Sequence, residues 1–278
     1  MLIFRDPAKF QRWALKQRAS GVRIGLVPTM GYLHEGHLSL IEIARKRADA
    51  AVVSIFVNPI QFGPGEDFAV YPRDEKSDLA KCRAAGAKAV FLPSPETMYA
   101  SDASVVVDES VLSDRLCGIR RPGHFRGVCT VVAKLFNLAL PEIAVFGRKD
   151  FQQAAVIKRM VRDLNFPVKI ITAPIVREPD GLAKSSRNVY LNPEERNRAT
   201  GLHEAIAYAR KAVAEAPVPA SSLTRKIERM LVKKGLRPDY VELLDADSLD
   251  PVKKATRGTA LLLAVFNGST RLIDNSIL

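Results

Sequence analysis

Residues 22–57 read VRIGLVPTMGYLHEGHLSLIEIARKRADAAVVSIFV, and this stretch decides the fold. An apolar run at 22–27 fits a buried strand, and apolar residues spaced as on one face of a helix follow at 37–47. A second β-rich run occupies 51–57. Strand, helix and strand in this order predict a βαβ unit, which places two parallel strands in one sheet.

The same alternation of strand and helix continues beyond this unit. An alternating pattern of about 170 residues lies within the usual size of one domain. We therefore predict an α/β fold whose first domain, residues 1–175, is a Rossmann-like parallel sheet with helices. The further helices are expected at 74–85, 128–140 and 151–164, and the further strands at 89–92, 143–146 and 168–172.

After residue 175 the pattern changes. Residues 177–188, REPDGLAKSSRN, are polar and contain Pro and Gly, which indicates a loop or linker. Asn192 is placed as an N-cap before Pro193, so a helix is expected over 193–214. Asn267-Gly268 predicts a two-residue hairpin loop. Residues 176–278 are therefore expected to form a smaller α+β domain. Its other elements are a helix at 222–234 and strands at 240–244, 259–266 and 270–273.

Composition narrows the class of protein. No apolar run approaches the ~18–20 residues that span a bilayer, and the N-terminal residues lack the pattern of a secretory signal. Cys82, Cys117 and Cys129 show no CxxC spacing and do not indicate a disulfide framework. We therefore expect a cytoplasmic protein that does not act at a membrane. The net charge of +12 comes from scattered Lys and Arg, which favours a solvated basic surface over a nucleic-acid site.

Two of the four histidines, His34 and His37, lie between the first predicted strand and helix. Open parallel sheets bind ligands at the carboxyl ends of their strands, and a helix N-terminus at that place favours anions. With Gly31 and Gly36 allowing close backbone approach, the stretch indicates a phosphate site in which one imidazole could carry a positive charge. A zinc site and chance surface histidines remain alternatives, although the zinc pattern HExxH has its histidines four apart.

Two other polar stretches fit phosphate. Gly147-Arg148-Lys149-Asp150 follows a predicted strand and opens a helix, with Lys149 suited to phosphate and Asp150 to a helix cap or a ribose hydroxyl. Gln153 lies on the same helix face. Residues 184–187, Lys-Ser-Ser-Arg, combine hydroxyls, backbone amides and a guanidinium. An ordinary charged helix start and a flexible polar linker remain the alternatives for these two stretches.

Two further segments mix polar and apolar residues. In FVNPIQF, residues 56–62, Asn58 and Gln61 are neutral hydrogen-bonding groups among apolar ones, a mixture that suits a small polar ligand. RPGHFRG, residues 121–127, concentrates cations around His124. It either faces an anion or forms an exposed turn.

Taken in order, these segments resemble the pantoate–β-alanine ligase family, part of the nucleotidyltransferase-like group of Rossmann-type folds with an HIGH-type histidine motif. The similarity runs nearly end to end over six motifs, PTMGYLHEGH, FVNPIQF, YPR at 71–73, RPGHFRGV, FGRKDFQQ and REPDGLAKSSRN. It implies ATP-dependent condensation of pantoate with β-alanine to pantothenate through a pantoyl-adenylate, with release of pyrophosphate and AMP. It also implies Mg²⁺, a homodimer and a cytoplasmic role in coenzyme A synthesis.

The resemblance also implies roles for single residues. His37 corresponds to the family's proton donor and His34 to its nucleotide-binding companion. Gln61 corresponds to a glutamine shared by pantoate and β-alanine, and Gln153 to one that binds pantoate. No residue is assigned to a protein-bound metal, and Mg²⁺ is expected to bridge the phosphates. The ATP-contacting positions implied are Met30, Gly31, Tyr32, Leu33, His34, Glu35, Gly36, His37, Gly147, Arg148, Lys149, Asp150, Val176, Lys184, Ser185, Ser186 and Arg187.

Two positions depart from the usual pattern of the family. Arg148 stands where the family usually has an acid, and Lys184 where it usually has Met. Both changes add positive charge near the expected triphosphate site. We expect the segment 176–190 to cover the adenylate. The alternative functions are another adenylylating or nucleotidyl-transferring enzyme, a basic RNA-binding protein, or a zinc hydrolase.

Overall fold

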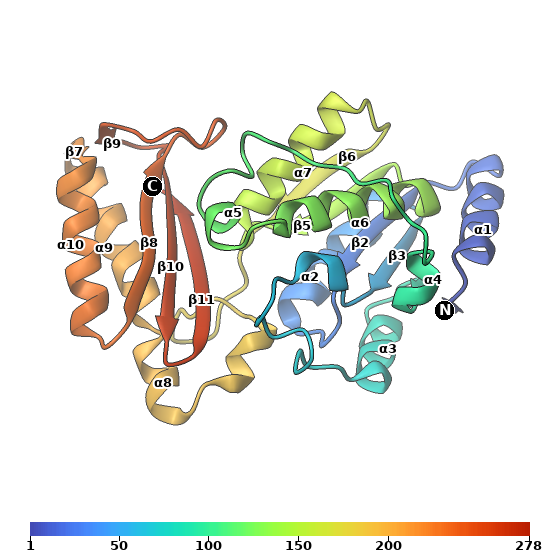
Figure 1. Cartoon of the computed structure of the whole chain (residues 1–278), viewed down its shortest axis with the longest axis horizontal. Coiled ribbons are helices and arrows are strands. Elements are labelled where there is room, and N and C mark those ends of the chain that lie inside the picture. Colours follow the sequence, from blue (N-terminus) through green and yellow to red (C-terminus); the bar gives the residue numbers. More distant parts are fainter. The chain divides into compact units, whose positions relative to one another are not determined.

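The computed structural model describes all of residues 1–278. The chain divides into two compact units, of which the first comprises residues 1–148 and 152–174 and the second residues 149–151 and 175–278. Figure 1 labels the elements along the chain. No helix is long and apolar enough to cross a membrane.

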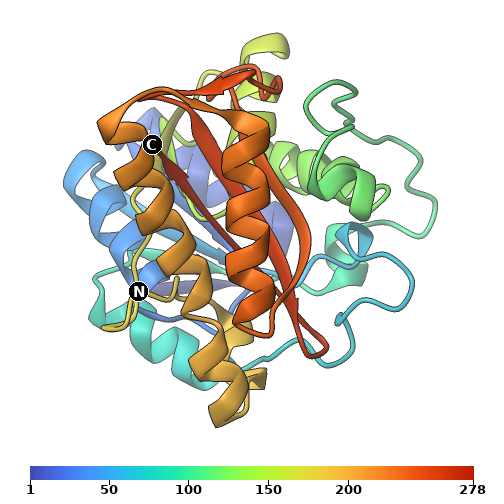
Figure 2. The ribbon, with the colours of Figure 1, turned by 90° about the vertical axis from the view of Figure 1, so that its left-hand side faces the viewer.

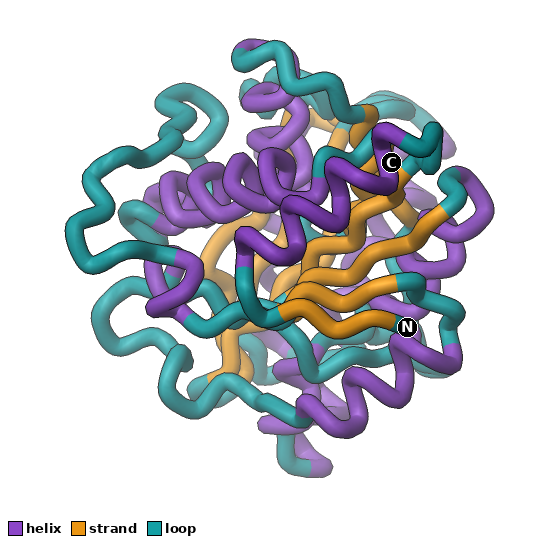
Figure 3. The backbone as a smooth tube through the Cα atoms, turned by 90° about the vertical axis from the view of Figure 1, so that its right-hand side faces the viewer, coloured by secondary structure: helices purple, strands orange, loops and turns teal.

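A six-stranded parallel sheet forms the centre of the first unit, in the order β1-β4-β3-β2-β5-β6 (Figure 3). Its central strand β2 (Ile24–Thr29) pairs with β3 (Ala50–Ile55) on one side and β5 (Ile143–Gly147) on the other. The strand order reverses between β2 and β5, and open α/β sheets bind ligands outside the carboxyl ends of the strands at such a point. The other strands are β1 (Leu2–Phe4), β4 (Ala89–Phe91) and β6 (Lys169–Ala173).

Helices follow the strands in the predicted alternation. The apolar face of α2 (Glu35–Arg47), with Leu40 and Ile41, packs against Val27 and Val53 of the sheet. The predicted α/β class and the βαβ unit are therefore confirmed. The other helices of this unit are α1 (Pro7–Ala19), η1 (Pro59–Gln61), α3 (Glu75–Ala84), α4 (Pro95–Met98), α5 (Cys117–Arg120), α6 (His124–Ala139) and α7 (Phe151–Asp163).

Some elements of this unit differ from the sequence-based expectation. The short edge strand β1 and the helix α1 are not predicted, although Asp6 caps α1 and Pro7 occupies its first position. The helix expected at 128–140 begins earlier, at His124. Gly123 precedes it with a left-handed φ of +80°, and this residue turns the chain into the helix.

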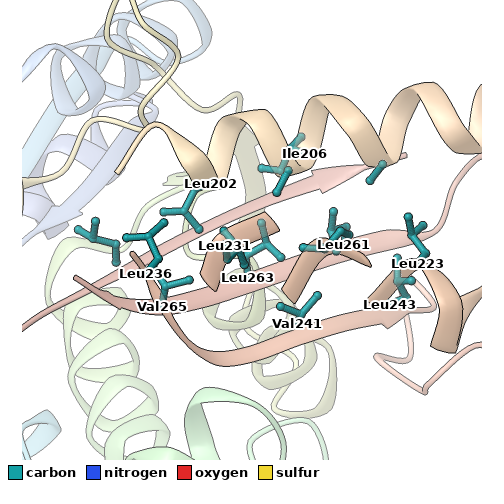
Figure 4. Packing of buried hydrophobic residues seen from close by; sticks show 14 of the residues in the cluster. Leu202, Ile206, Leu223, Leu231, Leu236, Val241, Leu243, Leu261, Leu263 and Val265 are labelled. Atoms are coloured by element: carbon teal, nitrogen blue, oxygen red, sulfur yellow. The ribbon is translucent and has the colours of Figure 1, made fainter. Parts of the chain in front are cut away.

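The second unit packs helices against a three-stranded antiparallel sheet, in the order β11-β10-β8 (Figure 2). Its core is formed by Leu202 and Ile206 of α9, Leu231 of α10, and Leu261 and Leu263 of β10 (Figure 4). This is the small α+β arrangement that the sequence predicts. The elements are η2 (Ser186–Tyr190), α8 (Pro193–Arg198), α9 (Gly201–Glu215), β7 (Val218–Pro219), α10 (Ala220–Lys233), β8 (Arg237–Leu244), β9 (Lys254–Ala255), β10 (Ala260–Asn267) and β11 (Thr270–Ile277).

The helix predicted over 193–214 is in fact two helices, α8 and α9. Its predicted start is correct, because the Asn192 side chain accepts a hydrogen bond from the backbone N–H of Glu195. The helix is interrupted at Thr200, whose hydroxyl donates to the Asn197 carbonyl at 2.8 Å and so competes for an acceptor of the helical ladder.

The hairpin between β10 and β11 is shifted by one residue from its predicted position. Asn267 pairs with Thr270 in the ladder, so the two-residue loop is Gly268-Ser269. Asn267 is fully buried, and its Nδ2 donates to the Glu195 carbonyl at 2.6 Å. A tertiary hydrogen bond thus places this residue in the strand rather than in the turn.

Candidate active site

A tight turn connects β2 to α2 at the carboxyl end of the sheet. Gly31 and Tyr32 take left-handed φ values of +86° and +51°. The Asp78 carboxylate accepts hydrogen bonds from the backbone N–H of Tyr32 at 2.8 Å and of Leu33 at 2.7 Å. A Cβ on Gly31 would lie 3.0 Å from Asp78 Oδ2. The backbone conformation therefore favours glycine here, and a larger residue would also press against the Asp78 carboxylate.

Asp78 supports this turn, and no sequence motif identifies it. It lies on α3 and is only 1% exposed. Burial raises the pKa of its carboxyl, while the bonds from Leu33 and Tyr32 and the charge of Lys81 oppose that rise. Lys81 also donates to the Leu33 carbonyl at 2.7 Å. In the sequence, Asp78 belongs to a charged helix and resembles a surface residue.

His34 and His37 form the first turn of α2. His34 is the N-cap, and its Nδ1 accepts a hydrogen bond from the backbone N–H of Gly36 at 3.1 Å. The Nδ1 of His37 accepts from the backbone N–H of His34 at 3.2 Å, and the ring centroids lie 4.1 Å apart. A Cβ on Gly36 would come within 2.8 Å of His34 Cε1. Gly36 thus makes room for the imidazole of His34.

These hydrogen bonds define the neutral form of both imidazoles. A ring nitrogen that accepts a hydrogen bond carries no hydrogen, so each neutral ring has its hydrogen on Nε2. Both rings then present Nε2–H donors at the positive end of the helix. Protonation of Nδ1 would break a bond to a backbone amide, so these two hydrogen bonds favour the neutral form of each ring. No group of three His, Cys, Asp or Glu could hold a metal ion, and the zinc alternative lacks a third ligand.

Gln61 is brought against Met30, as expected if both line one site. Gln61 ends η1 and is 8% exposed, and its Nε2 lies 3.1 Å from Met30 Sδ. Its Oε1 accepts a hydrogen bond from Asn58 Nδ2 at 3.0 Å, and Tyr99 OH donates to Asn58 Oδ1 at 2.8 Å. Because the Asn58 NH₂ can only donate, it fixes which end of the Gln61 amide is oxygen. The second hydrogen on Gln61 Nε2 can be donated in a hydrogen bond to an acceptor atom of a ligand.

The segment RPGHFRG is an exposed turn only at Pro122 and Gly123, and its remaining residues from His124 onward begin α6. His124 begins α6, is 8% exposed, and has its Nδ1 2.9 Å from the Gln61 carbonyl oxygen. Gly127 lies against η1 so closely that a Cβ there would collide with the Ile60 carbonyl. This segment therefore supports Gln61 from behind, a role that its sequence does not reveal.

The carboxyl end of β5 carries the stretch Gly147 to Asp150. Gly147 has no left-handed φ, and no atom lies within 4 Å of the place that a Cβ would occupy. Neither conformation nor packing requires glycine at this position, and the open space beside its backbone fits the close approach of a ligand. Arg148 continues the ladder by donating from its backbone N–H to the Ala173 carbonyl at 2.8 Å. Lys149 and Asp150 belong to the second unit, with their charged atoms 3.8 Å apart.

Two successive glutamines near the start of α7 have different surroundings. Gln152 is buried, with its amide bonded to the backbone N–H of Cys117 and to the carbonyls of Leu112 and Arg115. It therefore anchors the preceding loop. Gln153 is half-buried and has none of these contacts. Of the two, only Gln153 retains an amide that could bind a substrate.

The polar stretch from Val176 forms a hairpin in the second unit. Lys184 donates from its backbone N–H to the Val176 carbonyl at 3.0 Å, and Glu178 donates to the Leu182 carbonyl at 2.8 Å. The Lys184 ammonium lies 3.3 Å from Glu178 Oε2. Arg177 closes the base of the hairpin through two hydrogen bonds, of 2.7 and 2.9 Å, to the carboxylate of Asp274, whose side chain is fully buried.

The residues after the hairpin form the short helix η2. The Ser185 hydroxyl caps it by accepting a hydrogen bond from the backbone N–H of Arg187 at 3.3 Å. Ser186 is buried, and Lys184 and Arg187 are half-buried. The expected phosphate-binding residues therefore lie on one short stretch, where hairpin and helix meet.

This chain is similar to known proteins over nearly its whole length. The family model described as pantoate-beta-alanine ligase matches residues 2–277. A protein of Anaeromyxobacter dehalogenans named pantothenate synthetase is 55% identical over 98% of this chain and 97% of its own length. One of Moorella thermoacetica with the same name is 51% identical over 100% of this chain and 99% of its own.

Solved structures agree with this match. The structure of pantothenate synthetase from Thermus thermophilus has a TM-score of 0.92 and 42% identity, covering 100% of this chain and 99% of that one. A pantoate-beta-alanine ligase from Francisella tularensis, complexed with beta-gamma ATP and beta-alanine, has a TM-score of 0.83 and 32% identity. The coverage is 100% of this chain and 97% of that one.

The turn after β2 depends on the carboxylate of Asp78, which can be tested by Asp78→Asn. The amide keeps the volume but turns one acceptor into a donor facing a backbone N–H. We expect the free energy of unfolding to fall by about 1–3 kcal/mol, measured by urea denaturation. Asp102→Asn, at an exposed position, is the matched control. Equal stability of the two variants would show that the turn does not need this carboxylate.

Proposed function

The chain belongs to the pantoate–β-alanine ligase family, and from this we propose how its residues carry out the ATP-dependent condensation of pantoate with β-alanine. The reaction forms the amide bond of pantothenate. ATP is needed because a carboxylate is a poor acyl donor. The observation that carries our assignment is the pair of hydrogen bonds from backbone N–H groups to the Nδ1 atoms of His34 and His37, which orient both imidazoles at the N-terminus of α2.

The proposed reaction has two steps. In the first, a carboxylate oxygen of pantoate attacks the α-phosphorus of ATP, and the bond to pyrophosphate breaks. The product is a pantoyl-adenylate, a mixed anhydride. In the second, the amine of β-alanine attacks the acyl carbon, loses a proton, and AMP leaves with the bonding electrons. Holding the carboxylate near the phosphorus supplies a large part of the rate.

We assign stabilisation of the first transition state to His34 and His37. Negative charge grows on the phosphate oxygens as pyrophosphate departs, and fixed donors lower that barrier by ~3–4 kcal/mol for a key donor. The backbone amides that hold both Nδ1 atoms keep the Nε2–H groups oriented before substrate binds. His37 takes the proton-donor role, and His34 contacts the nucleotide.

We assign orientation of pantoate to Gln61 and Gln153. The Gln61 amide presents its NH₂ group because Asn58 occupies its oxygen. An NH₂ group recognises an oxygen acceptor such as a carboxylate. The contact between Gln61 and Met30 supports placing this glutamine beside the turn that carries the histidines.

The ATP contacts are proposed for both units. In the first, the backbone of Gly147 offers space for close approach, next to Arg148. In the second, Lys149 and Asp150 are assigned to phosphate and ribose. The remaining proposed contacts, supported by their clustering on the hairpin and η2, are the Val176 backbone N–H and the side chains of Lys184, Ser185, Ser186 and Arg187.

The surroundings of Lys184 moderate the charge that this residue adds. Its ammonium is paired with Glu178 at 3.3 Å. An acid this close offsets much of the positive potential that a phosphate would otherwise meet. We therefore propose that Lys184 binds nucleotide only as it exchanges Glu178 for a phosphate.

Magnesium, the homodimer and the cytoplasmic location complete the proposal. No group of three His, Cys, Asp or Glu is placed to hold a metal ion, so we propose that Mg²⁺ arrives as the companion of ATP, bound by its phosphates. For the homodimer, support comes from the exposed apolar side chains of Val105, Val106, Val111 and Ile119, gathered in one segment of the first unit.

The two-step scheme predicts exchange of pyrophosphate without β-alanine. With ATP, Mg²⁺, pantoate and radiolabelled pyrophosphate, label should appear in ATP because adenylate formation is reversible. Other small carboxylates serve as controls and should support little exchange. An enzyme preparation that makes pantothenate but shows no pantoate-dependent exchange would refute the adenylate intermediate.

The role of His37 predicts a large kinetic effect with little loss of stability. His37→Ala removes an oriented donor, so kcat for the exchange should fall by about 10²–10³, while the thermal midpoint should fall by only the few degrees that loss of one capping hydrogen bond costs. His37→Gln keeps an amide N–H near the Nε2 position and should recover part of the rate. Near-normal turnover of His37→Ala would remove this residue from the mechanism.

Gly147 provides a separate test of the nucleotide site. Because nothing in the chain occupies the space beside it, Gly147→Ala should leave the thermal midpoint unchanged. The added methyl group should raise KM for ATP by about tenfold and leave KM for pantoate unaffected. Unchanged KM for ATP would show that the nucleotide does not approach this backbone.

A further inference from the structure

A chain of polar side chains runs behind Gln61 in the first unit. The Glu66 carboxylate accepts two hydrogen bonds from the Arg121 guanidinium, of 2.7 and 2.6 Å. Arg121 Nη1 lies 3.1 Å from His124 Nε2, and His124 Nδ1 lies 2.9 Å from the Gln61 carbonyl oxygen. The chain Glu66–Arg121–His124 thus ends on the backbone of Gln61.

The partners of His124 decide its protonation state. A guanidinium only donates hydrogen bonds, so His124 Nε2 must be the acceptor from Arg121. A carbonyl oxygen only accepts, so His124 Nδ1 must carry the hydrogen that Gln61 receives. His124 is therefore a neutral imidazole with its hydrogen on Nδ1, the opposite tautomer to that of His34 and His37. Glu66 holds Arg121 in place, and although burial alone would raise the pKa of Glu66, the bonds from Arg121 bring it below its ordinary value.

Helix α6, which begins at His124, also holds the side chain of Gln61. Asn58 Nδ2, which orients the Gln61 amide, donates its other hydrogen bond to the Gly127 carbonyl at 3.1 Å. Gly127 permits this because a Cβ there would lie 2.7 Å from the nitrogen and Cα of Gln61. The first turn of α6 thereby fixes both the backbone of Gln61, through His124, and its amide, through Asn58.

We propose that His124 is a positioning residue for pantoate. It acts through its hydrogen bond to the Gln61 carbonyl and keeps the Gln61 side-chain amide in the position where it contacts the substrate. This rests on the proposed function of Gln61. The hydrogen bond from Nδ1 carries the effect, and Arg121 and Glu66 serve to select the tautomer that can donate it. Loss of that bond leaves the Gln61 carbonyl with only the longer hydrogen bond from Arg121 Nη2, at 3.4 Å, and frees η1 to shift, so binding of pantoate weakens while binding of ATP does not.

Two amide substitutions separate the contacts of His124. In His124→Asn the side-chain NH₂ stands near the Nδ1 position and can still donate to the Gln61 carbonyl, but the contact with Arg121 is lost. In His124→Gln the longer side chain places its amide near the Nε2 position, where its oxygen can accept from Arg121, and the bond to Gln61 is lost. Both are neutral polar residues at the first position of α6, so they serve as matched controls for each other.

Steady-state kinetics distinguish the two variants. His124→Gln should raise KM for pantoate by about tenfold or more, with KM for ATP and the thermal midpoint close to those of His124→Asn. His124→Asn should stay within about threefold of wild type for pantoate. Equal KM values for pantoate in the two variants, or a rise in both substrates' KM together, would overturn the proposal in favour of a merely structural role.

A double-mutant cycle with Gln61→Ala separates failure of this inference from failure of the proposed function. If His124 acts through Gln61, then His124→Gln should cause no further rise in KM for pantoate once Gln61 is alanine, because the two positions are coupled. Additive effects would overturn the positioning role. If Gln61→Ala alone leaves KM for pantoate unchanged, the assignment of Gln61 as a substrate residue fails, and the inference fails with it.

Discussion

The two hydrogen bonds that the Asp78 carboxylate accepts from the backbone N–H groups of Tyr32 and Leu33 are the constraint on which the rest of the site depends. A non-glycine residue at φ +51° costs of the order of 1–3 kcal/mol and persists only where its surroundings hold it. The buried carboxylate meets that need by accepting both amide hydrogens. The chain can then leave the central strand, reverse, and start α2 at the carboxyl edge of the sheet. A looser turn would leave the first residues of α2 without a defined direction.

The spacing of the two histidines follows from that helix start. His34 is the N-cap and His37 the third helical residue, the two positions that exchange hydrogen bonds in a capping box. In the usual box, hydroxyl and carboxyl groups accept from the backbone. Here imidazole nitrogens accept instead, and the bonds leave the hydrogen of each neutral ring on Nε2. The separation of three residues and the glycine at position 36 are therefore explained by helix capping, and an oriented pair of donors is the result.

Much of the fold was predictable from the sequence, because periodicity and cap residues are local signals. The βαβ unit and the N-cap at Asn192 are examples. Features that depend on long-range packing were not predictable. In the sequence Asp78 resembles a surface residue, and only the packing of α3 under the turn shows that it is buried. In the sequence His124 resembles part of a basic turn, and only the packing of η1 against α6 shows its contact with Gln61. Asn267 looks like a turn residue until a distant carbonyl binds its amide. In each case a partner far away in the sequence decides the outcome.

The site as proposed handles anionic substrates with neutral donors near the reacting atoms. Gln61 and the histidines carry no formal charge in the forms that the hydrogen bonds define, and Asn58 behind them is neutral too. A fixed cation beside the pantoate carboxylate would stabilise the free nucleophile as much as the transition state, and equal stabilisation of both gives no acceleration. A neutral N–H donor orients the carboxylate while leaving more of its nucleophilicity intact. The cations proposed for ATP can then act where charge increases, on the departing pyrophosphate.

The tautomers of three imidazoles therefore matter to the chemistry as much as the positions of the side chains. Backbone amides, a guanidinium and a carbonyl set these tautomers before substrate arrives.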